Sequence, residues 1–597
     1  MNKYVTVEFP RLNKSIDIEE NSKISDACEK VGHPLNLVCG SKGKCKKCAV
    51  DIEFDGHIKT VLGCQETVFD GLKVLIEDEK VEAQILTTSV LKDFKPNPSL
   101  TSMYLEKSQL KTDLAENNWD TVLSKLGENL HTPSLEVLQK ISKIYHNDDG
   151  LTFILHNNLL IDVVAGDTSN EIYGLAFDIG STSVVGYLYN MKTHEQIGVS
   201  SRLNKQTQIG GDVISRIDHT MSNPNGLERL RSLVIETINE ITDNICTENQ
   251  IDKDKIYHAS FCGNSTMQHL FLGLYPEHLG MSPFTSTIHK EVSTKCSYFG
   301  ININPNAQIS FLPLLGGFVG ADTSAVLLSL PNDDKKRLVI DLGTNGEIAV
   351  GSNFSYKVAS TACGPALEGA GLESGMRGTK GAIEKFEIKD GDVEYKVIGD
   401  VKPRGICGSG IIDLISELLR CNVINKRGAI VDKSKVNNSK LADRIIKNDN
   451  IKSFIICYEN ETESGKAIII SQKDIRQVQL AKAAIFTGCN MLITECGLTG
   501  VDLDEILIAG AFGNYIDIVK AQYMGMIPSY ENVPIYSIGN AAATGCQMFL
   551  LSKDDQKECN TIAENAIHIE LATNPSFSTQ YMANSYFRDN HEDESSL

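Results

Sequence analysis

Residues 176–183 read Ala176-Phe177-Asp178-Ile179-Gly180-Ser181-Thr182-Ser183, and residues 339–347 repeat this pattern as Val339-Ile340-Asp341-Leu342-Gly343-Thr344-Asn345-Gly346-Glu347. Each copy has an apolar strand, an aspartate, a glycine turn with hydroxyl or amide side chains, and a second strand. The glycine lets the backbone approach a phosphate, the turn donates hydrogen bonds to its oxygens, and the aspartate can hold Mg2+ through water. The repeat therefore predicts two facing hairpins that clamp one triphosphate.

A third glycine turn supports this prediction. Residues 505–514 form an apolar strand followed by Gly510-Ala511-Phe512-Gly513-Asn514. The chain contains no G-x4-GK[ST] motif, and no G-x-G-x2-G motif follows a strand, so P-loop and Rossmann sites lack their signal. A single D-x-G turn is usually a mere hairpin, but two matched copies and a third turn indicate nucleotide binding.

Together the three turns resemble the phosphate-1, phosphate-2 and adenosine segments of the actin, sugar kinase and Hsp70 superfamily. The resemblance runs from about Gly174 to Met582. It implies a multidomain α/β protein whose C-terminal part has a duplicated actin-like, ribonuclease H-like ATPase fold. It assigns ATP and Mg2+ to Asp178, Gly180, Ser181, Thr182, Ser183, Asp341, Gly343, Thr344, Asn345, Gly510, Ala511, Phe512 and Gly513.

Four cysteines near the N-terminus have the spacing of a metal cluster site. Cys39, Cys45, Cys48 and Cys64 follow the pattern C-x5-C-x2-C-x15-C, with three of the cysteines on one glycine-containing loop. Four thiolates can hold two irons, and small residues let backbone amides approach the cluster sulfurs. A four-cysteine zinc site is the alternative, although zinc ribbons usually present two C-x2-C knuckles and this segment has one.

Predicted strands surround these cysteines. Residues 5–9 and 15–19 alternate apolar and polar side chains, a short helix through Val31 follows, and a second hairpin turns at Asp55-Gly56. The segment resembles a β-grasp [2Fe-2S] ferredoxin. Its first cysteine gap is one residue longer than the plant-type C-x4-C-x2-C and resembles the adrenodoxin-like variant.

The sequence predicts five segments. A ferredoxin-type domain at residues 1–86 is followed by a flexible linker at 87–118, which contains Lys95-Pro96-Asn97-Pro98. A small α+β domain at 119–171 comes next, with a helix from Leu135 to Tyr145 and a hairpin turned at Asn157-Asn158. The ATPase domain occupies 172–583, and an acidic tail occupies 584–597.

Composition limits the class of protein and its partners. The 597 residues include 57 basic and 77 acidic side chains, for a net charge of −20, and mean hydropathy is −0.14. This charge has the wrong sign for a general nucleic-acid or anionic-membrane binder, and the chain lacks apolar runs near 18 residues. The first nine residues carry an early charge and no secretory apolar segment, so we expect a cytoplasmic protein. There, sixteen cysteines are reduced thiols or ligands rather than disulfides.

A [2Fe-2S] module fused to an actin-like body resembles the reductive activators of corrinoid proteins. Body motifs that carry this resemblance include Gly263-Asn264-Ser265-Thr266-Met267 and Gly364-Pro365-Ala366-Leu367-Glu368. The resemblance implies an ATP-dependent enzyme that returns inactive Co(II) corrinoid to Co(I) by one-electron transfer, in a methyltransferase system such as O-demethylation or the acetyl-CoA pathway. Plant-type clusters have potentials of about −400 mV, and the family's corrinoid couple lies lower, so ATP must supply free energy.

Two other functions remain open from the sequence. One is ATP-dependent electron injection into another low-potential acceptor, and the other is a redox-sensing regulator without turnover. The resemblance implies a corrinoid protein and an unidentified low-potential electron donor as partners. The sequence does not determine the oligomeric state, and a homodimer is among the states it allows.

Overall fold

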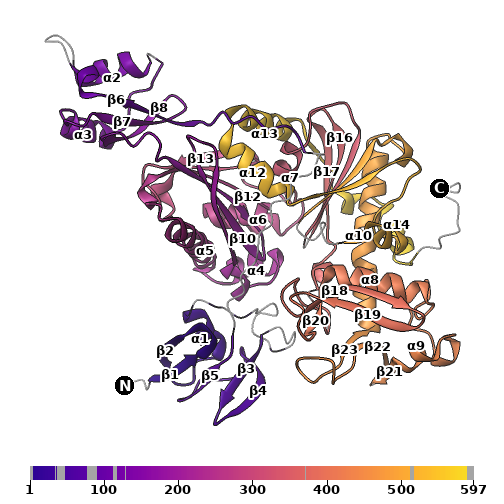
Figure 1. Cartoon of the computed structure of the whole chain (residues 1–597). Helices are drawn as coiled ribbons and strands as arrows, with labels where there is room; N and C mark the ends of the chain where they lie inside the picture. Colours follow the sequence, from indigo (N-terminus) through magenta and orange to yellow (C-terminus); the bar gives the residue numbers. More distant parts are fainter. Residues whose placement is uncertain are drawn as a thin grey trace. The chain divides into compact units, whose positions relative to one another are not determined.

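The computed structural model describes residues 4–31, 33, 35, 43, 48–76, 91–111, 117–127, 129–343, 345–369, 371–448, 450–510 and 516–587. The chain divides into two compact units, and Figure 1 labels their helices and strands. Unit 1 comprises Met1–Gln84, Asp93–Ser329 and Ala542–Glu564. Unit 2 comprises Ile85–Lys92, Leu330–Ala541 and Asn565–Leu597.

The N-terminal module of unit 1 is a helix packed on a mixed sheet of order β2-β1-β5-β3-β4. Strand β1 pairs antiparallel with β2 and parallel with β5, and both predicted hairpins are confirmed. The side chains of Val7, Phe9 and Cys28 are fully buried in its core. Burial raises the pKa of the Cys28 thiol to about 12, as befits an unreactive core residue. The elements are β1 (Tyr4–Phe9), β2 (Lys14–Glu19), α1 (Ile24–Lys30), β3 (Ala49–Phe54), β4 (His57–Leu62) and β5 (Lys73–Val74).

The middle domain is a three-stranded sheet with two helices. Its strands are β6 (Leu100–Leu105), β7 (Leu151–His156) and β8 (Leu159–Ala165), and its helices are α2 (Asn118–Leu126) and α3 (Leu135–Ile144). The predicted helix and hairpin are confirmed. Strand β6 corrects the predicted linker, because residues 100–105 pair antiparallel with β7. Leu100 and Leu105 are buried there, and their burial stabilises the strand. The polar residues between them weaken the strand pattern in the sequence.

A six-stranded sheet of order β11-β10-β9-β12-β14-β13 forms the rest of unit 1. Strands β9 to β11 form an antiparallel meander, and β12 and β14 add to it in parallel. The strands are β9 (Tyr173–Ile179), β10 (Ser183–Asn190), β11 (Gln196–Leu203), β12 (Ile256–Gly263), β13 (Val292–Lys295) and β14 (Gln308–Phe311). The helices are α4 (Val213–Ser222), α5 (Gly226–Asn249), α6 (Ser265–Leu272), α7 (Ala321–Leu328), α12 (Ala541–Leu551) and α13 (Lys553–Asn565).

Unit 2 repeats this arrangement in a sheet of order β25-β24-β15-β16-β17-β26. Strands β15 to β17 form the antiparallel meander, and β24 and β25 add in parallel. The duplication inferred from the two D-x-G turns is therefore present in the topology. The strands are β15 (Arg337–Leu342), β16 (Gly346–Ser352), β17 (Ser355–Thr361), β24 (Glu505–Ala509), β25 (Ile535–Gly539) and β26 (Ile567–His568).

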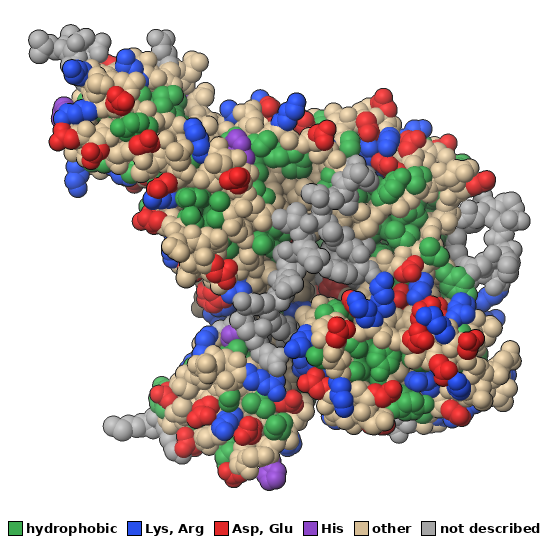
Figure 2. Space-filling view, viewed as in Figure 1, with side chains coloured by type: hydrophobic (Ala, Val, Ile, Leu, Met, Phe, Trp, Pro, Cys, Tyr) green, Lys and Arg blue, Asp and Glu red, His purple; other side chains and the backbone are tan. Residues whose placement is uncertain are grey.

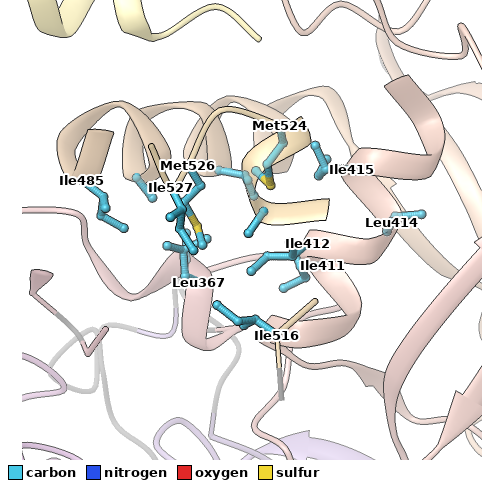
Figure 3. Close-up of a cluster of buried hydrophobic side chains, with 14 of the residues drawn as sticks. Leu367, Ile411, Ile412, Leu414, Ile415, Ile485, Ile516, Met524, Met526 and Ile527 are labelled. Atoms are coloured by element: carbon cyan, nitrogen blue, oxygen red, sulfur yellow. The ribbon is translucent and has the colours of Figure 1, made fainter. Parts of the chain in front are cut away.

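Between β17 and β24 the chain adds two small sheets and several helices. Helix α10 spans Gln472–Glu495. Figure 3 shows apolar side chains from α8, α10 and the segment around α11 that pack into one buried core. The added elements are β18 (Ala382–Lys389), β19 (Asp392–Val397), β20 (Gly405–Ile406), α8 (Gly408–Arg420), α9 (Ser439–Asp443), β21 (Ile445–Asn448), β22 (Ile451–Cys457), β23 (Ile468–Ser471) and α10 (Gln472–Glu495); α11 (Ile518–Tyr523) and α14 (Phe577–Asn584) follow β24.

Charged side chains of both signs are interspersed over the described residues on the face drawn in Figure 2. Among the described helices, none is both long and apolar enough to cross a membrane.

Candidate nucleotide and cluster sites

The first phosphate-type turn joins β9 to β10 in unit 1. Ile179 pairs with Val184 across the hairpin, and the Gly180 N–H donates to the Ser183 carbonyl at 2.9 Å. An added Cβ at Gly180 would lie 2.7 Å from that carbonyl oxygen, so only glycine fits this tight turn. Asp178 lies near the carboxyl end of β9, and its register partner in the parallel strand β12 is Cys262.

A carboxylate that the motif search missed lies beside this turn. Asp322 is in the first turn of α7, after Gly320, and its Oδ1 accepts a 2.7 Å hydrogen bond from the Thr323 N–H. Burial raises the pKa of the Asp322 carboxyl to about 6; the Thr323 N–H opposes the rise, and the nearby Asp178 carboxylate adds to it. Two interacting carboxylates at strand and helix ends can share a divalent cation. The signal in the sequence was the glycine-rich run from residue 316 to 320 before Asp322.

Close packing brings these elements together. A Cβ at Gly263, at the end of β12, would lie 2.6 Å from the Ile179 carbonyl oxygen. A Cβ at Gly320 would lie 2.4 Å from the Asn264 Cα. The glycines therefore let the end of β9, the end of β12 and the start of α7 approach within contact distance.

The second turn joins β15 to β16 in unit 2. The Gly343 N–H donates to the Asn345 carbonyl at 3.0 Å, whereas Thr344 lies outside the described residues. Asp341 pairs with Ala509 of the parallel strand β24, so the third glycine turn begins directly beside it. Gly510 has φ +97°, and a Cβ there would lie 2.9 Å from Asp341 Oδ1. The fold thus brings two of the three predicted segments together at one sheet edge, where α/β proteins bind ligands.

Ala511, Phe512 and Gly513 lie outside the described residues. Unit 2 contains a cavity of about 640 Å³, whose lining includes Ile516 and Asp517. Strands β18 and β19, helix α8 and the start of α11 surround it, and its volume falls in the range of small-molecule pockets. Asp413 anchors one wall, since its carboxylate accepts from the Phe386 N–H at 3.1 Å and lies 3.2 Å from Lys520 Nζ.

Two of the four predicted cluster cysteines lie side by side in the N-terminal module. Cys48 Sγ and Cys64 Sγ are 3.1 Å apart, and both side chains are almost fully buried. Gln65 Nε2 donates to Cys64 Sγ at 3.3 Å. When two thiolates bind one tetrahedral metal through bonds of about 2.3 Å, their sulfur atoms lie about 3.8 Å apart. The 3.1 Å between Cys48 Sγ and Cys64 Sγ is therefore short enough for both to bind one iron.

Cys39 and Cys45 lie outside the described residues, as do most residues of the loop that carries them. In the described part of the chain, no group of three or more potential metal ligands occurs. The sulfur donors present fit an iron–sulfur cluster, because soft thiolates prefer such metals. Cys262, Cys363 and Cys407 in the body are also buried.

Comparison with known proteins matches nearly the whole chain. Residues 335–596 match the family model described as the C-terminal domain of RACo, the ASKHA domain, and residues 173–333 match the model of the RACo middle region. The corrinoid activation enzyme RamQ of Eubacterium limosum is 47% identical over 98% of this chain and 99% of its own length.

Two further proteins share this similarity. The [Co(II) methylated amine-specific corrinoid protein] reductase of Methanosarcina barkeri is 25% identical over 69% of this chain and 76% of its own length. The solved structure of a reductive activator for corrinoid, iron-sulfur protein superposes with a TM-score of 0.75, at 29% identity and over 98% of both chains.

Proposed function

Since this chain belongs to the RACo family of corrinoid-activating enzymes, we propose that it reduces the inactive Co(II) form of a corrinoid protein to Co(I) in an ATP-dependent reaction. The observation that carries this proposal is the 47% identity to a corrinoid activation enzyme over nearly the full length of both chains. The segments to which we assign the electron-transfer module and the ATPase body both fall within the length matched to this relative.

We place the electron carrier at the N-terminal module. The parallel pairing of β1 with β5 and the helix across the sheet are features of the β-grasp ferredoxin fold. Cys39, Cys45, Cys48 and Cys64 would hold a [2Fe-2S] cluster, which when bound supplies a one-electron carrier of low potential. Burial of Cys48 and Cys64 excludes water from their sulfurs, and the Gln65 amide stabilises negative charge on Cys64 Sγ.

We place ATP and Mg2+ at the phosphate-type turns. Asp178 and Asp322 would hold Mg2+ in unit 1, and Asp341 would do so in unit 2, because Asp178 and Asp341 directly precede the two glycine turns and the Asp178 carboxylate lies near that of Asp322. The adenosine would contact the turn at Gly510–Gly513 and the cavity that begins after it. Its wall residues Asp413 and Lys520 offer acceptors and a donor to a nucleoside.

ATP is needed because the electron has to move to a couple of lower potential. Each 59 mV of unfavourable difference costs about 1.4 kcal/mol for one electron. A nucleotide that binds one conformation of the body more tightly can supply a few kcal/mol by shifting that equilibrium. The partner would be a corrinoid protein of a methyltransferase system, the protein would act in the cytoplasm, and the electron would come from a low-potential donor.

The test is anaerobic reduction of a purified Co(II) corrinoid protein, followed by the visible absorption of the corrinoid, with and without Mg-ATP. We expect sustained reduction only with ATP and a reduced electron donor. Asp341→Ala should abolish the ATP dependence while the absorption of the iron–sulfur module is retained. Stoichiometric binding of the corrinoid protein without any turnover would instead identify a redox-sensing regulator.

A further inference from the structure

Three carbonyls of the turn between β9 and β10 accept hydrogen bonds from residues that follow β11. The Gly180 carbonyl accepts from Asn204 Nδ2 at 2.9 Å, and the Thr182 carbonyl accepts from the Asn204 N–H at 2.9 Å. The carbonyl between them, that of Ser181, accepts from an NH2 group of Arg216. All three carbonyls of the turn are therefore bound to donors that come from the segment after β11.

This arrangement orients the amide groups of the turn. In a trans peptide the N–H points opposite to the C=O of the same unit. The N–H groups of Ser181, Thr182 and Ser183 consequently point away from Asn204 and Arg216. Successive N–H groups that point to one side form an anion-binding concavity.

Arg216 is a fully buried cation whose hydrogen-bond partners are neutral. Its Nε donates to the Gly210 carbonyl at 2.9 Å, and NH1 donates to Gln206 Oε1 at 3.0 Å and lies 3.3 Å from Met267 Sδ. Among the described residues, no carboxylate lies within ion-pair distance of it. Burial lowers the pKa of Arg216 to about 9, with Asp212 opposing the shift, so the protein itself compensates this charge only in part.

We propose that Arg216 is the positioning residue of the phosphate-binding turn: it withdraws the Ser181 carbonyl from the site, and a bound polyphosphate supplies the counter-charge that the surrounding side chains lack. The inference rests on the proposed ATP site and adds to it a residue that makes no contact with nucleotide. It predicts that the contribution of Arg216 grows with the number of phosphates on the ligand.

The test compares the full-length protein with its Arg216→Met variant by calorimetry, using Mg-ATP, Mg-ADP and adenosine. We expect the affinity for ATP to fall at least tenfold, that for ADP to fall less, and that for adenosine to stay within twofold. Arg231→Met is the matched control. Arg231 lies on α5 of the same unit, stacks over Phe299 and donates to the Tyr298 carbonyl, so its loss should leave all three affinities unchanged.

An unchanged ATP affinity in Arg216→Met, or an equal loss for adenosine, would overturn the inference. A wild-type protein without affinity for ATP would overturn the proposed site and this inference with it. If Arg216→Met fails to fold, Gln206→Glu provides a second test, since it sets a carboxylate against NH1 and keeps the guanidinium in place. ATP affinity should then fall. The melting temperature should also drop, because the substitution removes the 2.9 Å hydrogen bond from Gln206 Nε2 to the Leu230 carbonyl, and an unchanged ATP affinity would again contradict the proposal.

Discussion

Replacing Gly510 with alanine is expected to impair ATP-dependent activity and spare the N-terminal module. Gly510 has φ +97°, where a side chain costs about 1–2 kcal/mol. The new Cβ would also lie 2.7 Å from the Leu342 carbonyl oxygen and 2.9 Å from Asp341 Oδ1. Both distances are shorter than carbon contacts tolerate, so the end of β15 and the Asp341 carboxylate have to move by several tenths of an ångström.

A displacement of 1 Å can cost about a hundredfold in rate, so we expect roughly a tenfold loss of ATP-dependent Co(II) reduction from this smaller shift. Gly497→Ala provides a matched control. Gly497 has φ +70° and no atom within 4 Å of the added Cβ, so this variant carries the backbone strain without the contact.

The assay measures the affinity for Mg-ATP, the rate of anaerobic Co(II) reduction with and without ATP, and the visible absorption of the iron–sulfur module. Gly510→Ala should lose ATP affinity and ATP-dependent rate relative to Gly497→Ala, and both should keep the absorption. Equal ATP affinities and rates in the two variants would refute the placement of Asp341 at the nucleotide.

Three further predictions concern other parts of the chain. Cys48→Ala or Cys64→Ala should remove the visible absorption and both irons; stoichiometric zinc without sulfide in the anaerobic wild-type protein would contradict the cluster assignment. A deletion of residues 1–86 should keep corrinoid-protein binding and lose Co(II) reduction. Full activity of the truncated protein after addition of the free module at micromolar concentration would show that the covalent link is not needed. Desolvation of the half-buried His156 lowers its pKa to about 4. As pH falls below about 6.5, the unfolded chain therefore takes up a proton before the folded chain does, and the free energy of unfolding should drop by up to about 3 kcal/mol. Calorimetry of His156→Gln should show a smaller drop over this range, and an equal drop would contradict the assignment.

The sequence by itself determined the parts of this protein that depend on local pattern. Period-two alternation identified the hairpins of the N-terminal module, and the repeated D-x-G turns identified the duplicated sheets; at Gly180 the tight turn leaves no room for a Cβ. The cysteine spacing predicted four cluster ligands in the same way. Hairpins, tight turns and ligand spacings can be predicted from the sequence because they depend on a few neighbouring residues.

Only the tertiary structure decided which distant residues join them. Strand β6 is stabilised by its pairing with β7, about fifty residues away. Its own composition is polar, and without that pairing in view it predicted a linker. Asp322 acquires its raised pKa from burial and from Asp178, and Arg216 reaches the Ser181 carbonyl across the interior of unit 1. These roles arise from burial and from contacts between residues far apart in the chain. A single residue without a surrounding sequence pattern predicts neither its burial nor its long-range contacts.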